Sequence, residues 1–158
     1  MGYTQAPSLT SEEIESFLTE AKIARFCSFN KDGTTHAVPV WFKYENGQIA
    51  VATPAASRKA RNVKRNHNVT VLVDVEKWPQ KGAIVYGEAE LEYPTSYEEH
   101  MSATVPLCEK YMPRDEAVNW CKGLFKISGP WAKIIVKPKR MASFDYAKDV
   151  TFETVAKG

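Results

Sequence analysis

The alternation of apolar and polar residues predicts a chain built mostly of strands. Apolar and β-branched residues gather in short runs, with polar or glycine-containing segments between them. Asp32-Gly33 and Asn46-Gly47 supply the positive φ of tight hairpin turns, so the first three strands should form an antiparallel meander. The six predicted strands are residues 23–29, 35–44, 48–53, 69–75, 83–93 and 131–136.

Helical periodicity covers shorter stretches. A capping residue, early acidic residues and apolar positions at helical spacing predict an amphipathic helix over about residues 11–21, lying on the mouth or flank of the sheet. A basic helix covers about 57–65, another begins at 94–96, and a last one covers about 115–124. Strands that mostly follow one another through hairpins, with few helices, favour a mainly β fold, a β-barrel with α decoration.

Prolines and glycines predict irregular positions in the strands. Pro39 has no amide hydrogen, so its strand should lie at an edge, a bulge or an opening in the ladder. Gly87 indicates a bulge or a close backbone approach. Lys137-Pro138-Lys139 should end the last strand. Beyond Met141, the segments FDY and VTFETV should form a short edge pair or wrap a partner.

Length and composition indicate one globular domain over residues 1–158, with an N-terminal helical segment 1–22, a barrel 23–137 and a tail 138–158. The net charge of only +2 argues against general attraction to nucleic acid or an anionic membrane. No apolar run approaches the roughly 20 residues of a membrane span. With no basic and apolar leader at the start, we expect a cytoplasmic protein.

The histidines and cysteines show no metal-binding spacing, so we predict no metal site. We interpret the cysteines as buried or incidental thiols in a reducing cytosol. These residues are His36, His67, His100, Cys27, Cys108 and Cys121.

The segment Thr53–Asn66, TPAASRKARNVKRN, is the first candidate binding site. Ser57 stands where the basic helix begins, so its hydroxyl and the free amides of the first turn can bind an anion. Arg58 and Lys59 are adjacent and cannot share one helix face, but a guanidinium fork and an ammonium group together can hold a terminal phosphate. From composition alone, a solvated basic face is the better interpretation.

The second candidate is Pro39-Val40-Trp41-Phe42. A strand broken by proline exposes backbone groups that can hydrogen-bond the edge of a flat heterocycle while apolar side chains cover its face. The alternative is an ordinary aromatic core strand. The paired acids Asp74 and Glu76 receive no acid/base role, and no catalytic side chain is predicted.

Taken together, DGTTHAVPVWFKYENGQIAVAT, SRKARNVKRN and VTVLVD, in this order and spacing, resemble the flavin-binding split-barrel family related to pyridoxamine 5′-phosphate oxidase. The resemblance continues more loosely through GEAEL and WAKIIVKPKRM. It implies a six-stranded antiparallel split barrel. The closing FDYAKDVTFETVAKG does not resemble the segment that grips pyridoxal phosphate in the true oxidases, so pyridoxamine phosphate is not the expected substrate.

In that family the unit of strand, loop and basic helix binds the flavin. The resemblance implies a phosphate grip at the start of the helix, backbone contacts to the isoalloxazine at the broken strand, and contacts to the ribityl chain from the strand end and the helix. The implied residues are Ser57, Arg58 and Lys59 for the phosphate, Thr53, Pro39, Val40 and Trp41 for the ribityl chain and ring, and Asn62 as a ribityl or supporting partner.

The resemblance further implies an FMN-dependent oxidoreductase whose flavin accepts a hydride at N5, in a homodimer with both flavin sites at the subunit interface. Trp131 or the region near Trp78 would come from the second subunit. Because Arg61, Lys64 and Arg65 exceed what one phosphate needs, the deazaflavin F420 is the alternative cofactor. A non-catalytic carrier or sensor of flavin, F420 or haem is a second alternative, and a basic-helix nucleic-acid binder is a third.

Overall fold

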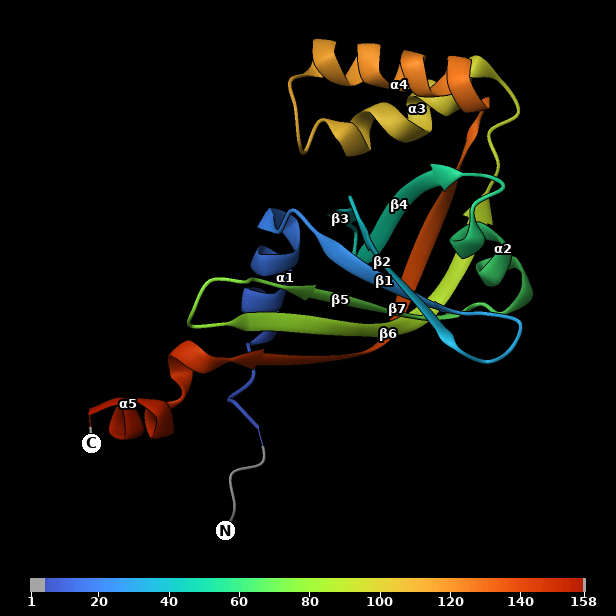
Figure 1. Cartoon of the computed structure of the whole chain (residues 1–158). Helices are drawn as coiled ribbons and strands as arrows, with labels where there is room; N and C mark the ends of the chain where they lie inside the picture. Colours follow the sequence, from blue (N-terminus) through green and yellow to red (C-terminus); the bar gives the residue numbers. More distant parts are fainter. Residues whose placement is uncertain (1–4, 158) are drawn as a thin grey trace.

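A computed structural model describes residues 5–157 of the chain, so residues 1–4 of the predicted N-terminal segment lie outside the described part. Its centre is one curled antiparallel sheet in the order β2-β1-β5-β6-β7-β4-β3 (Figure 1). Neighbouring strands in this order are hydrogen-bonded to each other. The strands are β1 (Ala24–Phe29), β2 (Thr35–Val40), β3 (Lys43–Glu45), β4 (Gln48–Pro54), β5 (Asn68–Asp74), β6 (Lys81–Glu92) and β7 (Trp131–Asp145).

Helices surround the sheet, and α3 and α4 lie together above β4 in Figure 1. All four helices predicted from the sequence are present, and a fifth follows β7. Among the described residues, no helix is long and apolar enough to cross a bilayer. The helical elements are α1 (Ser11–Glu20), α2 (Arg58–Arg65), α3 (Tyr97–Cys108), α4 (Arg114–Ser128), the 3-10 helix η1 (Tyr146–Lys148) and α5 (Val150–Lys157).

The strand predicted over 35–44 is divided in two, which gives seven strands in place of six. Within the described part of the chain, β2 pairs only with β1, whereas β3 pairs only with β4. The predicted meander is therefore wrong beyond its two hairpins. Since β2 and β3 form opposite edges of the sheet order but are separated only by Trp41 and Phe42, this short link brings the edges together and curls the sheet. The predicted opening near Pro39 is confirmed.

The core fills the inside of the curled sheet. Fully buried Phe26 and Phe42 meet aliphatic residues from the other strands, and Phe17 and Leu18 of α1 pack against the same cluster. The predicted cap is confirmed, because Thr10 and Glu13 form a reciprocal capping box.

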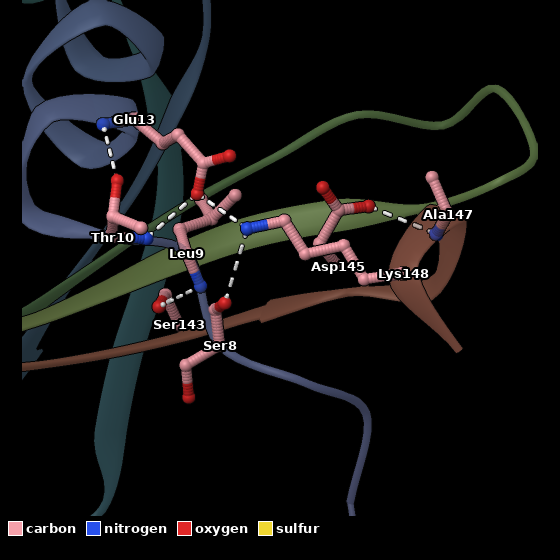
Figure 2. Close-up of polar contacts among 8 residues, drawn as sticks. All are labelled: Ser8, Leu9, Thr10, Glu13, Ser143, Asp145, Ala147 and Lys148. Carbon is pink, nitrogen blue, oxygen red and sulfur yellow. Dashed lines mark hydrogen bonds and ion pairs between the residues drawn. The ribbon is translucent and has the colours of Figure 1, made fainter. Parts of the chain in front are cut away.

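The N-terminal segment is held along the far end of β7 (Figure 2). The amide of Leu9 donates to Ser143 Oγ at 2.9 Å, and Lys148 forms an ion pair with Glu13. The amide of Asp145 also donates to the carbonyl of Pro7 at 2.8 Å. These contacts fix α1 over the core and leave the opposite end of the sheet to α2, α3 and α4.

The last strand continues past the predicted stop at Pro138. The pairing with β6 shifts register between Tyr86 and Gly87, and Pro138 pairs with Gly87 at that shift. At this irregularity the regular ladder is interrupted, so β7 accommodates a residue without an amide hydrogen. The predicted bulge at Gly87 is confirmed.

The edge pair predicted for the tail is wrong, whereas the alternative, that the tail wraps a partner, stays a prediction. Phe144 and Asp145 end β7, Tyr146 begins η1, and the VTFETV segment is helical in α5. Among the described residues of the tail no edge pair forms, and β7 instead pairs with β6 as far as Lys81 and Asp145.

Gly87→Ala should destabilise the fold by about 1–3 kcal/mol, the range for overpacking. A Cβ at Gly87 would lie 2.5 Å from the backbone oxygen of Lys137, which a strand paired on both sides cannot easily move. Gly123→Ala in α4 is the matched control, because a Cβ there meets nothing within 4 Å, and it should stabilise the helix by about 0.5–1 kcal/mol. Urea unfolding of both variants measures the change in the free energy of unfolding, which should be negative for Gly87→Ala and positive for Gly123→Ala. Equal changes in the two variants would contradict the close approach at Gly87.

Candidate functional site

A cavity of about 260 Å³ lies where the strand break, the end of β4, the start of α2 and the α3–α4 pair meet. We call it the apolar cavity. Most of its lining is aliphatic or aromatic, with few polar side chains. The lining residues are Pro39, Val40, Trp41, Ala52, Thr53, Pro54, Lys59, Thr104, Leu107, Cys108, Trp120, Leu124 and Trp131.

The polar end of the apolar cavity is built by the junction of β4 and α2. Buried Thr53 donates its hydroxyl hydrogen to Ser57 Oγ at 3.0 Å, and Ser57 Oγ accepts the amide of Ala60 at 3.3 Å. Ser57 is thus the N-cap of α2. Burial lowers the pKa of Lys59, which lines the cavity beside this turn. A helix N-terminus and an ammonium group therefore both favour an anion here.

The neighbouring residue Arg58 faces a different hollow. This pocket of about 360 Å³ combines four cationic side chains with one carboxylate and two asparagines, and we call it the basic pocket. As predicted for adjacent helical residues, Lys59 and Arg58 lie on different faces of α2. The basic pocket is lined by Asn30, Lys31, Asp32, Arg58, Arg61, Asn62 and Arg65.

Asn62 is buried, and its amide already has partners within the chain. Its Nδ2 donates to Ser28 Oγ and to Asn30 Oδ1, each at 3.1 Å, while its Oδ1 accepts from Arg65 at 2.8 Å. These bonds attach α2 to β1 and the turn that follows it. Asn62 lines the basic pocket and not the apolar cavity, so it is separated from Thr53 and Lys59.

The break between β2 and β3 is held open by Tyr111, which follows α3. The Tyr111 hydroxyl accepts the amide hydrogen of Phe42 at 2.7 Å and donates to the Phe42 carbonyl at 2.9 Å. Its ring stacks on Trp41 with centroids 4.4 Å apart and planes 8° from parallel. Burial raises the pKa of Tyr111 to about 12, so the phenol stays protonated at neutral pH. The backbone groups of Phe42 are thus satisfied internally, while Pro39, Val40 and Trp41 line the cavity.

The outer wall of the apolar cavity comes from α3 and α4, a contribution that sequence reasoning missed. Leu107, Trp120 and Leu124 face the strand break from these helices. Buried His100 joins them to the sheet, since its Nε2 lies 3.1 Å from the Cys121 carbonyl and its Nδ1 accepts the amide of Trp131 at 3.1 Å. Helical periodicity could find these apolar positions but not the surface they cover.

The two tryptophans assigned to a second subunit lie in different places. Trp131 lines the apolar cavity of its own chain. Trp78 lies on the loop between β5 and β6, with its ring 5.6 Å from that of Tyr146. Asp74 and Glu76 both face Arg25, and Asp74 pairs with it at 2.7 Å. Within residues 5–157, no group of three or more His, Cys, Asp or Glu side chains is arranged to hold a metal ion.

Comparison with known proteins places this arrangement in a family. The model of the family described as pyridoxamine 5′-phosphate oxidase matches residues 10–127, which include the strand break, β4, α2 and most of the α3–α4 pair. The chain belongs to the pyridoxamine 5′-phosphate oxidase-like family. Its split-barrel fold is the one implied by the sequence resemblance.

Solved structures agree on the split barrel of this family. A conserved hypothetical protein, Rv2991, from Mycobacterium tuberculosis has a TM-score of 0.74 at 23% identity, covering 92% of each chain. An FAD-binding protein from Mesorhizobium loti has a TM-score of 0.61 at 19% sequence identity, and the match covers 87% of this chain and 95% of that protein's chain. An F420 reductase has a TM-score of 0.64 at 18% sequence identity, and the match covers 84% of this chain and 98% of the reductase chain. The comparison with curated proteins found no match. At these identities the similarity shows the fold alone.

Proposed function

We propose that the protein binds FMN in the apolar cavity and transfers electrons or hydride between the flavin and a small-molecule substrate. The observation that supports this proposal is the polarity of the cavity, which has a cationic helix N-terminus at one end and aromatic and aliphatic walls at the other. A flavin mononucleotide has the same division between a phosphate and a flat ring system. Membership of the pyridoxamine 5′-phosphate oxidase-like family supports the same assignment.

The chain's own residues would bind and orient the cofactor. The first turn of α2 lies between the two pockets, so a phosphate on its free amides would have Lys59 on one side and Arg58 on the other. The ring would lie against Pro39, Val40 and Trp41, with Thr53 near the ribityl chain. A bound flavin supplies the redox chemistry. We assign no protein acid or base.

F420 is the second candidate cofactor, and the basic pocket favours it. Arg61, Arg65 and Lys31 gather positive charge beyond the first turn of α2, where an additional anionic segment of a longer cofactor could bind. FMN has no second anionic group to use this charge. Titrating the cofactor-free protein with FMN and with F420 in parallel would show which of the two cofactors binds more tightly.

We further propose that the protein is a cytoplasmic homodimer whose second subunit completes the flavin site. Trp120 lines the cavity yet remains 52% exposed, so a large aromatic surface continues outward from the site. Covering it with a second copy would exclude water from the ring edge. Sedimentation of the flavin-loaded protein tests this, and a monomer that retains the flavin would contradict it.

The experiment that tests the proposed function is the absorbance spectrum of the protein as purified, followed by mass spectrometry of the released ligand. We expect the spectrum and mass of FMN. A deazaflavin or haem spectrum would replace FMN with one of the alternatives. A colourless protein that takes up no added FMN would overturn the proposal. Reduction of the bound flavin by a reduced nicotinamide would separate an enzyme from a carrier.

FMN affinity should depend on pH through His36 on β2. Burial, with added repulsion from Arg58 and Lys59, lowers the pKa of His36, so it is neutral at neutral pH in the free protein. A bound phosphate favours the protonated ring, and binding then takes up a proton. The affinity of the native protein relative to His36→Gln should rise roughly two- to fivefold as the pH falls from about 7 to about 5.5. Titrating both proteins with FMN at each pH removes the effect of the phosphate's own ionisation from the comparison. A ratio of the two affinities that does not change with pH would contradict the role of His36.

A further inference from the structure

Two buried thiols meet between the helices that form the outer wall of the apolar cavity. Cys108 ends α3 and Cys121 lies within α4, and their sulfur atoms are 3.7 Å apart, with Cys121 donating an S–H hydrogen bond. The side chains of Val105 and Ala117 complete the same small cluster. Cys108 lines the apolar cavity, but neither cysteine is among the residues assigned to hold the flavin, and both are free thiols.

We propose that Cys108 and Cys121 form a reversible disulfide that fixes α3 to α4 over the cavity. A disulfide needs the sulfur atoms at about 2 Å, so forming the bond requires side-chain rotation and a shift of two helices that already pack together at these cysteines. In a reducing compartment such a bond is transient and characteristic of redox sensing.

The order in which the two cysteines react follows from how easily an oxidant in the cavity reaches each sulfur atom. Cys108 lines the cavity, whereas Cys121 is fully buried behind it. Hydrogen peroxide that enters the cavity therefore meets Cys108 first. The sulfur of Cys108 attacks the peroxide, the O–O bond breaks, and a sulfenic acid and one molecule of water form. The Cys121 sulfur then attacks the sulfenic sulfur, the S–O bond breaks, and a second water leaves as the S–S bond forms. In sum, two thiols and one hydrogen peroxide give one disulfide and two waters.

The reaction should be selective rather than fast. Burial, together with the neighbouring Cys121, raises the pKa of Cys108 to about 12, so the thiol stays protonated at neutral pH. The rate of oxidation should then increase with pH. Cys27 lies apart on β1 and lines neither the apolar cavity nor the basic pocket, so it takes no part in this reaction and can be replaced in the test.

The disulfide would restrict the movement of α3 and α4, which form the outer wall of the apolar cavity, and would leave the β-barrel unchanged. Leu107 precedes Cys108, and Trp120 and Leu124 flank Cys121, so the bond would join the two segments that cover the strand break. His100 already holds the Cys121 carbonyl. The oxidised protein should therefore open its α3–α4 wall less often, whichever ligand the cavity takes.

The test uses the full chain carrying Cys27→Ser, oxidised with hydrogen peroxide at mildly alkaline pH and mapped by mass spectrometry after alkylation. We expect a linked peptide containing Cys108 and Cys121, its loss on reduction, and slower amide hydrogen exchange across residues 97–128 in the oxidised form. Adding Cys121→Ser should leave Cys108 as a sulfenic acid that dimedone traps. Thiols that stay free, or that pair only between chains, would overturn the proposal. Unchanged hydrogen exchange in a disulfide-linked sample would overturn the fixing of the wall.

Discussion

Replacing Arg58 and Lys59 together with alanine should weaken FMN binding by at least about 100-fold. Hydrogen bonds to a charged phosphate are worth roughly 1.5–3 kcal/mol each, and every 1.4 kcal/mol changes the affinity about tenfold. The two side chains lie on opposite sides of the first turn of α2, one in each pocket, so neither can substitute for the other. Isothermal titration of the flavin-free proteins measures the difference.

The control is a double variant that removes the same charge elsewhere. Lys64 and Lys122 are exposed and line neither pocket, so Lys64→Ala with Lys122→Ala should change FMN affinity less than about threefold. Both double variants should keep the native melting temperature within a few degrees, because the substituted side chains lie outside the core. Equal affinity in the two double variants would mean that the phosphate is held elsewhere.

Tyr111→Phe should destabilise the protein by about 2–4 kcal/mol and distort the cavity. The lost hydroxyl bonds both the amide and the carbonyl of Phe42, which is fully buried, and an unpaired buried polar group costs roughly 1–3 kcal/mol. Because these bonds hold the strand open beside Trp41, FMN binding should weaken along with stability. Denaturant unfolding and FMN titration of the same sample measure both effects.

Tyr93→Phe is the matched control, since Tyr93 is 48% exposed and follows the end of β6. It should change the free energy of unfolding by less than about 0.5 kcal/mol. If Tyr111→Phe were as mild as this control, the strand break would be maintained by packing of the rings alone, and the role assigned to the hydroxyl would be wrong.

The parts of the fold that could be predicted depend on local chemistry. Thr10 with Glu13 is a capping signal that operates within one turn, and this cap forms as expected. Ser57 stands at the start of the basic helix, as predicted, and caps it. Gly33 and Gly47 adopt the positive φ that their hairpin turns require. In each case the sequence within a few residues decides the structure.

What could not be predicted depends on distant partners. Pro138 looks like a strand end, but Gly87 on another strand provides the bulge that accommodates it. Likewise, Pro39 indicated an opening, yet the exact break at Trp41 and Phe42 depends on a hydroxyl about 70 positions later in the chain. The outer wall was missed for the same reason, since Trp120 and Leu124 lie on a helix whose periodicity carries no information about what it covers.

Arg58 and Lys59 line separate pockets, and this arrangement narrows the proposed phosphate site to the first turn of α2. The sequence predicts that Ser57, Arg58 and Lys59 form one phosphate grip. In the structure Lys59 lines the apolar cavity and Arg58 lines the basic pocket, whereas Ser57 caps α2 and lines neither. The turn itself is therefore the proposed phosphate site, and the two side chains flank it. Asn62 instead holds this helix against β1.

The most direct measurement compares FMN with riboflavin, which has the same ring and ribityl chain but no phosphate, in equilibrium titrations of the flavin-free protein. We expect FMN to bind at least about 100-fold more tightly than riboflavin, because the amides of α2, Arg58 and Lys59 act on the phosphate alone. Equal affinities, or no binding of FMN at all, would contradict the assignment of the helix N-terminus as a flavin phosphate site.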